Sequence, residues 1–483
     1  MEKVILYPSP FIGHIISMVE LGKLLITQSP TLSSITIIIP SSPFNNNDSY
    51  SSYISSVSSS FPSITFLFHP SIPLLLGDLS NYDDQEHITY ETLRNNNNNV
   101  LESLQSISIS STITAFIIDF FCYSALEVSQ SLNIPTYFFM PSGASVLAFF
   151  LNLPVYDRKF TGSFRNLDVL LEIPGLFSLP TDHMIECMLD RGVSFNEFVK
   201  LGETFLKSNG IIINTFDSLE VKAVMGLKQG GCLPGTPIPP VYCIGPLIAP
   251  RGGSNGGEGE GESERGGERH ECLRWLDDQP SGSVVYLCFG SEGVFSKEQV
   301  CEIAIGLERS GVRFLWVVRA PPSENKVDVF FPSLHEPDLD SLLPEGFLDR
   351  TKDRGHVVKS WVPQIEVLGH VSIGAFVTHC GWNSTLEAVC AGLPMVAWPL
   401  YAEQKFNKIL LVEEIKIALP MEESEDRFVN SNEIEKRVKQ IMNSKEGDYV
   451  RKRVLEMKDK AKIALNEGGS SNVALKMLIE SWQ

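Results

Sequence analysis

Long apolar runs, paired cysteine motifs and clusters of basic residues are all scarce in this chain. No apolar stretch approaches the roughly 20 residues of a bilayer-spanning helix, and the run in TAFIIDFFCY is split by Asp119. The opening MEKVILYPSP has one lysine and only four apolar residues before its first proline, which is far short of a signal peptide. We therefore expect a cytoplasmic protein without stable membrane insertion.

The cysteine and charge counts exclude further classes of protein. The nine cysteines contain no C-x-x-C pair, so neither a disulfide framework nor a zinc site is indicated. They are typical of small buried side chains in a reducing compartment. The formal net charge of −19 argues against nucleic acid as a partner, because nucleic acid is bound by clustered Lys and Arg.

Strand-length apolar runs alternate with helical patterns along most of the 483 residues. The pattern predicts a parallel, doubly wound sheet, and the length suits two domains. The polar tracts at residues 41–60 and 95–99 and the insert around 321–340 are predicted to be loops. Helical patterns are predicted at residues 15–28, 297–309 and about 449–481, and strands at residues 4–7, 35–39, 115–118, 136–140, 210–214, 284–289, 314–318 and 356–359.

The composition changes near Pro250. The stretch APRGGSNGGEGEGESERGGERH is rich in Gly and Glu and has almost nothing to bury, so residues 250–272 are predicted to be a flexible linker. We accordingly expect a first domain over residues 1–249, a second over 273–448 and a helical C-terminal segment over 449–483.

Residues 361–404 form the most informative stretch of the chain. A strand-length run at 374–378 is followed by HCG, and a helical pattern begins at Ser384 and stops near Gly392. This layout collects anions, because unpaired N–H groups and the positive end of the helix dipole point at one place. A diphosphate fits there. Taken alone, Ser384 with Glu387 also matches the capping box of an ordinary strand–loop–helix unit.

Three residues outside this stretch carry suitable chemistry. His14 follows the first strand in the loop PSPFIGH, and a histidine with an unperturbed pKa of ~6.5 suits proton removal near neutral pH. Asp119 ends an apolar strand and needs a partner, which is either a backbone amide at the next helix or His14. Ser291, in CFGSEG, stands at a glycine-rich turn where a diphosphate can bind. No full G-x-G-x-x-G and no G-x-x-x-x-G-K-[ST] occurs, which excludes nicotinamide oxidoreductases and P-loop proteins.

Eight polar or aromatic positions make residues 361–404 closely similar to the signature box of plant family-1 UDP-glycosyltransferases, which act on small lipophilic molecules. They are Trp361, Gln364, His379, Trp382, Asn383, Glu387, Glu403 and Gln404. The resemblance covers nearly the whole chain, and PSPFIGHIISMVELGKLL is similar to the branch that glycosylates flavonoids and chalcones. It implies the α/β GT-B fold, with two Rossmann-like doubly wound domains facing across a cleft. The last helix would cross back onto the first domain.

The resemblance also implies roles for individual residues. His14 would be the catalytic base and Asp119 would hold its tautomer. Trp361 would stack on uracil, Gln364 and Glu387 would bind the base or ribose, and Gln404 favours glucose as the sugar. The full donor set is Ser291, Trp361, Val362, Gln364, His379, Trp382, Asn383, Ser384, Glu387, Glu403 and Gln404.

The acceptor site is expected in the first domain. Its candidate residues are apolar and aromatic, which fits a planar polyphenol, although most could equally be core. They are Phe11, Ile12, Phe120, Phe121, Met140 and Met184.

These features predict an inverting, monomeric UDP-glucose-dependent glucosyltransferase that forms a β-O-glucoside of a small phenolic compound. We expect no cofactor and no metal, because no carboxylate pair has metal-ligand spacing and a helix N-terminus can neutralise the departing UDP. C-glucosylation or glucosylation of a terpenoid remains open, since both would use the same donor site. A non-catalytic UDP-sugar-binding protein is the alternative from another class.

Overall fold

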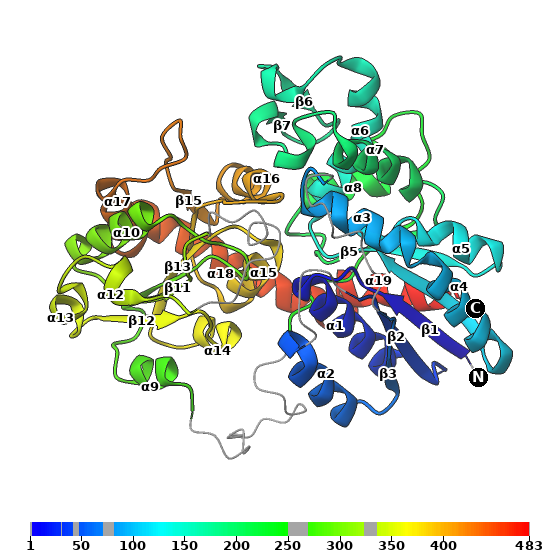
Figure 1. Cartoon of the computed structure of the whole chain (residues 1–483), viewed down its shortest axis with the longest axis horizontal. Helices are drawn as coiled ribbons and strands as arrows, with labels where there is room; N and C mark the ends of the chain where they lie inside the picture. Colours follow the sequence, from blue (N-terminus) through cyan, green and yellow to red (C-terminus); the bar gives the residue numbers. More distant parts are fainter. Residues whose placement is uncertain are drawn as a thin grey trace. The chain divides into compact units, whose positions relative to one another are not determined.

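The computed structural model describes residues 2–29, 31–41, 48–70, 82–249, 269–322 and 336–482. The chain divides into two compact units, one formed by Met1–Ala249 with Ile463–Gln483 and the other by Pro250–Lys462. Each unit is a parallel sheet flanked by helices (Figure 1). The predicted α/β class is therefore confirmed. In the described residues, no helix is both long enough and apolar enough to cross a membrane.

The first unit is built on a seven-stranded parallel sheet of order β3-β2-β1-β4-β5-β8-β9. Its central strands are rich in Val, Ile, Phe and Tyr because helices cover them and both of their faces are buried. The strands are β1 (Glu2–Tyr7), β2 (Ser34–Ile39), β3 (Ile64–Phe68), β4 (Thr112–Asp119), β5 (Thr136–Met140), β8 (Gly210–Ile213) and β9 (Val241–Cys243). A small antiparallel pair, β6 (Leu170–Glu172) and β7 (Ser178–Pro180), lies apart from this sheet.

The described part of the first unit has nine α-helices, and one of them, α19, comes from the end of the chain. Helix α19 packs on β9, where Ser471 Oγ donates to the Gly245 carbonyl at 2.6 Å, and Leu475 and Leu478 join the core of the first sheet. The described helices are α1 (Ile12–Gln28), α2 (Asp48–Ser60), α3 (Gln85–Asn95), α4 (Asn97–Ser110), α5 (Ala125–Ser131), α6 (Ala144–Lys159), α7 (Val193–Phe205), α8 (Val221–Lys228) and α19 (Ser470–Glu480).

The second unit repeats the design with a six-stranded parallel sheet of order β12-β11-β10-β13-β14-β15. Its strands are β10 (Val284–Cys288), β11 (Arg313–Val318), β12 (Gly355–Lys359), β13 (Ile373–Thr378), β14 (Met395–Ala397) and β15 (Ala418–Pro420). Its helices are α9 (Glu271–Asp277), α10 (Lys297–Ser310), α12 (Leu339–Leu342), α13 (Phe347–Thr351), α14 (Gln364–Leu368), α15 (Trp382–Ala391), α16 (Gln404–Ile409), α17 (Ser431–Asn443) and α18 (Lys445–Leu465).

Two predicted loops are partly helical instead. Within residues 41–60, α2 occupies Asp48–Ser60, and the asparagine run at 95–99 joins α3 to α4. Asn96 in that run is buried, and its amide nitrogen lies 2.9 Å from the Tyr7 hydroxyl and 2.8 Å from His69 Nδ1. The surface-loop prediction was wrong here because these partners, distant in sequence, satisfy the amide in the interior.

The C-terminal helical pattern is interrupted. The single helix predicted at about 449–481 is two helices, α18 and α19, and Gly468 between them has a φ of 78° that ends the first. Helix α18 runs through residue 448, the predicted domain boundary. Residues 250–268 of the predicted linker and 323–335 of the predicted insert lie outside the described residues. Helix α9 begins at Glu271, before the predicted linker ends.

Candidate active site

The strand order of the first sheet brings His14 and Asp119 together. Strands β1 and β4 are neighbours where the order reverses, and doubly wound sheets bind their ligands outside the carboxyl ends of strands at such a point. Asp119 is the last residue of β4, and His14 lies in the first turn of α1, directly after β1. The sequence placed His14 in a loop, which was wrong because α1 already begins at Ile12.

A short hydrogen bond joins the two side chains. His14 Nδ1 lies 2.7 Å from Oδ2 of the fully buried Asp119 carboxylate, whereas the imidazole is partly exposed. The other carboxylate oxygen accepts from the Phe121 backbone N–H at 3.0 Å. Asp119 therefore uses both of the partners that the sequence allowed. When Nδ1 donates to the carboxylate, the lone pair of the neutral imidazole is on Nε2.

Three of the acceptor candidates surround His14 with aromatic rings. The ring centroids of Phe11, Phe120 and Phe121 lie 5.6, 5.6 and 5.7 Å from that of the imidazole. Ile12 starts α1 and is half-buried. The remaining candidates, Met140 at the end of β5 and Met184, are buried in the first unit. The rings of Phe11, Phe120 and Phe121 thus form an apolar surface around the hydrogen-bonded His14 and Asp119 at one edge of the sheet.

The donor residues gather at the matching place in the second unit. Strands β10 and β13 are neighbours where the strand order of that sheet reverses. Ser291 is exposed in the loop after β10, and the buried His379 directly follows β13. Helix α15 begins at Trp382 rather than at Ser384, and its N-cap residue, Gly381, contributes no side-chain cap. The capping-box interpretation was therefore wrong, and the first-turn N–H groups receive no side chain from the N-cap.

His379 is wedged between two glycines. A Cβ on Gly290 would lie 2.6 Å from His379 Nε2, and one on Gly381 would lie closer still. The ring also stacks on Tyr401 at 5.9 Å between centroids. Burial lowers the pKa of His379 to about 4, so the imidazole is neutral near pH 7. Its Nδ1 is buried without a hydrogen-bond partner among the described residues, a costly state that a bound oxyanion would relieve.

Three further donor residues form one hydrogen-bonded cluster. Gln364 starts α14, and its amide nitrogen lies 2.9 Å from Ser384 Oγ and 2.7 Å from Glu387 Oε2. The Gln364 amide oxygen accepts from the Tyr286 hydroxyl at 3.3 Å. Glu387, on the second turn of α15, does not cap that helix. Burial raises the pKa of the Glu387 carboxyl to about 7, against the lowering effect of the Gln364 hydrogen bond.

The raised pKa of Glu387 makes stability depend on pH. Because the folded pKa of about 7 exceeds the unfolded value, the stability contributed by this group is present below about pH 4.5 and is lost as the pH rises through 7. Glutamine does not titrate, so we expect the Glu387→Gln variant to lack this decrease in the free energy of unfolding as the pH rises. The free energy of unfolding of the variant, relative to wild type, should rise by up to about 3 kcal/mol between pH 4.5 and 7.5.

Urea unfolding across this pH range measures the difference between the two proteins. The exposed Glu413, changed to Gln, serves as the control and should give a difference that does not vary with pH in this window. Parallel stability curves for wild type and Glu387→Gln would contradict the assignment of the buried carboxyl.

Trp361 presents an open ring beside this cluster. It follows β12, is 64% exposed, and meets the edge of the His270 ring at 5.9 Å between centroids. Val362, next to it, is buried. An exposed tryptophan beside a polar cluster offers a flat surface on which an aromatic base can stack.

The remaining predicted donor residues differ from one another in their surroundings. Trp382 is buried at the start of α15, and Asn383 follows it half-buried. Glu403 precedes α16, and its Oε1 lies 3.4 Å from Asn407 Nδ2. The Gln404 amide oxygen accepts from the backbone N–H groups of Leu400 and Tyr401 at 2.9 and 3.0 Å. Gln404 therefore fixes the turn after β14, and its side chain is also hydrogen-bonded to that of Tyr401.

Backbone conformation marks this region in a way that sequence reasoning missed. Ser360, Cys380 and Ala402 all have left-handed φ values, 63°, 67° and 50°, and each immediately precedes or follows a donor residue. Such strain in non-glycine residues clusters at functional sites.

Asn407 was also missed: it is fully buried, and its amide donates to the Cys380 carbonyl at 2.9 Å. Its spacing of four from Glu403, the N-cap residue of α16, was the available signal.

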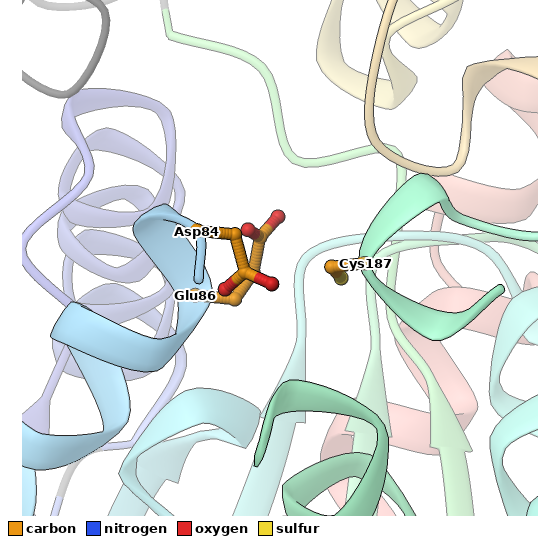
Figure 2. Close-up of side chains that lie close together, drawn as sticks. All are labelled: Asp84, Glu86 and Cys187. Atoms are coloured by element: carbon orange, nitrogen blue, oxygen red, sulfur yellow. The ribbon is translucent and has the colours of Figure 1, made fainter. Parts of the chain in front are cut away.

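One group of side chains in the described residues has the geometry to hold a metal ion. The ligand atoms of Asp84, Glu86 and Cys187, in the first unit, lie within 4.8 Å of one another (Figure 2). None of the predicted donor or catalytic residues belongs to it.

Comparison with known proteins places this geometry in a family. Residues 266–455 match the family described as UDP-glucoronosyl and UDP-glucosyl transferase. The chain is 48% identical to UDP-glycosyltransferase 88B1 of Stevia rebaudiana, with 100% of this chain and 99% of the relative aligned. It is 45% identical to phloretin 2'-O-glucosyltransferase of Malus domestica, with 99% of each aligned. Its structure is similar to that of Phytolacca americana UGT2 complexed with UDP-2fluoro-glucose and pterostilbene, with a TM-score of 0.85, 33% identity and full coverage of both chains.

Identity at this level over the full length of both chains, together with the fold, confirms the predicted GT-B class. The chain belongs to the plant UDP-glycosyltransferases of the UDP-glucuronosyl and UDP-glucosyl transferase family.

Proposed function

We propose that this protein transfers glucose from UDP-glucose to a hydroxyl group of a small phenolic acceptor and releases the β-O-glucoside and UDP. The observation that carries the proposal is the 2.7 Å hydrogen bond between His14 and the buried Asp119 under a group of phenylalanine rings. A neutral imidazole oriented by a buried carboxylate is suited to take a proton from a phenol.

His14 acts as the general base in this mechanism. Nε2 accepts the proton of the acceptor hydroxyl while the acceptor oxygen attacks the anomeric carbon of the α-linked donor. The bond from that carbon to the diphosphate oxygen breaks, UDP leaves with the electron pair, and the configuration inverts. Asp119 stabilises the imidazolium that forms, because its carboxylate accepts the Nδ1–H and is held in place by the Phe121 amide.

The second unit supplies the donor site. The N-terminus of α15, the buried His379 and Ser384 and the half-buried Asn383 stabilise the negative charge on the departing diphosphate. Trp361 stacks on the uracil, and Gln364 with Glu387 binds the ribose hydroxyls. Charge neutralisation by N–H groups and neutral side chains supports transfer without a metal ion, and we propose metal independence.

Phenolic acceptors are proposed from two kinds of support. The rings around His14 favour a flat aromatic molecule. The Malus domestica relative acts on phloretin, and the Phytolacca americana structure holds pterostilbene. We further propose that the protein works in the cytosol as a monomer; its nine cysteines all carry free thiols.

A turnover assay in EDTA tests the proposal. Purified protein receives UDP-glucose, UDP-galactose or UDP-glucuronate with a panel of flavonoids, chalcones and simple phenols, and products are read by mass spectrometry. We expect one added hexose from UDP-glucose and loss of the whole hexose on fragmentation, as in an O-glucoside. Cross-ring fragmentation would indicate a C-glucoside. UDP-glucose binding without product from any phenol would contradict the proposed acceptor class.

A further inference from the structure

A row of aromatic rings leads from His14 into the first unit. Phe121 contacts the imidazole at 5.7 Å between centroids, and Tyr90 of α3 contacts Phe121 at 5.2 Å. Phe198 of α7 packs against both rings, 6.0 Å from Phe121 and 5.5 Å from Tyr90. The row therefore leads from His14 into the interior of the first unit, because the Phe121, Tyr90 and Phe198 side chains are buried.

Tyr90 brings an unsatisfied polar group to the far end of this row. Its side chain is 2% exposed, and its hydroxyl has no hydrogen-bond partner among the described residues. Burial raises the pKa of Tyr90 far above its ordinary value, so the hydroxyl keeps its proton and can both donate and accept. A buried hydroxyl without a partner is costly, and an unexplained one is a feature of ligand sites.

The metal-like group identified above lies beside this hydroxyl. Glu86 stands four residues before Tyr90 on α3, which puts both on one face of the helix. Cys187 comes from the 3-10 helix Glu186–Met188, and the side chains of Asp84, Glu86 and Cys187 point toward one another (Figure 2). The charges of Cys187 and Glu86 both act to raise the pKa of the Tyr90 hydroxyl, in addition to burial.

The occupied contacts in this group argue against a metal ion. Asp84 Oδ1 accepts from the His87 backbone N–H at 2.8 Å and from Ser194 Oγ at 2.5 Å, so this carboxylate caps α3. Burial raises the pKa of the Cys187 thiol, and the Glu86 and Asp84 carboxylates raise it further. The thiol can donate to Glu86.

We propose that Tyr90 determines acceptor specificity: its hydroxyl, with Glu86 and Cys187 beside it, binds a second hydroxyl at the far end of a two-ring phenol whose reacting hydroxyl lies at His14. The inference rests on the proposed function and deepens it, since it names the acceptor class as phenols with a polar group on each ring. The acceptor hydroxyl would donate to the carboxylate or to the tyrosine oxygen and accept from the tyrosine O–H, which satisfies the buried Tyr90 group.

A symmetric substrate pair tests this inference. The kcat/KM values for 4,4'-dihydroxystilbene and 4-hydroxystilbene are compared in wild type and Tyr90→Phe, with UDP-glucose saturating. Either hydroxyl of 4,4'-dihydroxystilbene gives the same monoglucoside, so its two equivalent hydroxyls by themselves raise its kcat/KM about twofold over that of 4-hydroxystilbene. In wild type, we expect the ratio of kcat/KM for the diol to kcat/KM for 4-hydroxystilbene to exceed two. We expect Tyr90→Phe to lower this ratio about 5- to 10-fold, the usual effect of one neutral hydrogen bond. The KM for UDP-glucose should not change.

Tyr123→Phe is the matched control. The Tyr123 ring contacts Tyr90 at 5.7 Å, but its hydroxyl already donates to Glu197, so its loss should leave the substrate preference intact. A merely structural Tyr90 hydroxyl would give an unchanged preference in Tyr90→Phe with an equal or higher Tm, and this result would overturn the inference alone. Failure of wild type to glucosylate either stilbene would overturn the proposed acceptor class as well.

Discussion

Replacing His14 with alanine is expected to lower kcat by at least about 100-fold, the usual contribution of a positioned general base. The imidazole is held by the buried Asp119 and ringed by phenylalanines. The donor residues belong to the other unit. The dissociation constant of UDP-glucose, measured by calorimetry, should therefore stay within about twofold of wild type, so that the loss lies in the chemical step.

Two further variants sharpen this test. Asp119→Asn can keep the hydrogen bond from the Phe121 amide but cannot stabilise an imidazolium, so kcat should also fall steeply. His370→Ala, which removes a histidine bonded to Asp277 at 3.0 Å in the second unit, should leave kcat nearly unchanged. Turnover by His14→Ala at the wild-type rate would refute the assignment of the base.

Replacing Gly381 with alanine is expected to weaken UDP-glucose binding by at least about tenfold. The added Cβ would overlap the His379 ring, which cannot move away because Gly290 and Tyr401 confine it on other sides. Either the ring or the N-terminus of α15 must shift, and both form the proposed diphosphate site. Overpacking of this kind typically costs about 1–3 kcal/mol of stability as well.

Gly231→Ala is a suitable control for this substitution. The nearest atom to a Cβ there is the Gly226 Cα at 3.8 Å, an ordinary contact, so binding and stability should both be preserved. UDP binding is measured by calorimetry on protein whose folding is checked by circular dichroism. A folded Gly381→Ala protein that binds UDP as tightly as wild type would mean that the diphosphate does not lie at the His379–Gly381 turn.

Local pattern was sufficient to predict most strands of the two parallel sheets, because a parallel sheet covered on both faces requires continuous apolar runs, but β3, β9, β14 and β15 were not predicted. The predicted strand at 136–140 coincides with β5, and the others differ at their ends by a few residues. Helix starts were less predictable. Phe11, the N-cap residue of α1, carries no N-cap signal, and Gly381 is a weaker N-cap signal than Ser384, so α1 and α15 were both placed too late.

The family of this protein, its α/β class and the candidate donor and catalytic residues can be predicted from short segments of the chain, since each depends on residue type and local spacing. Contacts between distant segments depend on strand order, which no local pattern carries. The parallel pairing of β1 with β4 joins His14 to Asp119, and that of β10 with β13 brings Ser291 and His379 to one edge. The buried Asn96, the wedged His379 and the unsatisfied Tyr90 arise in the same way, because burial is a property of the packed chain.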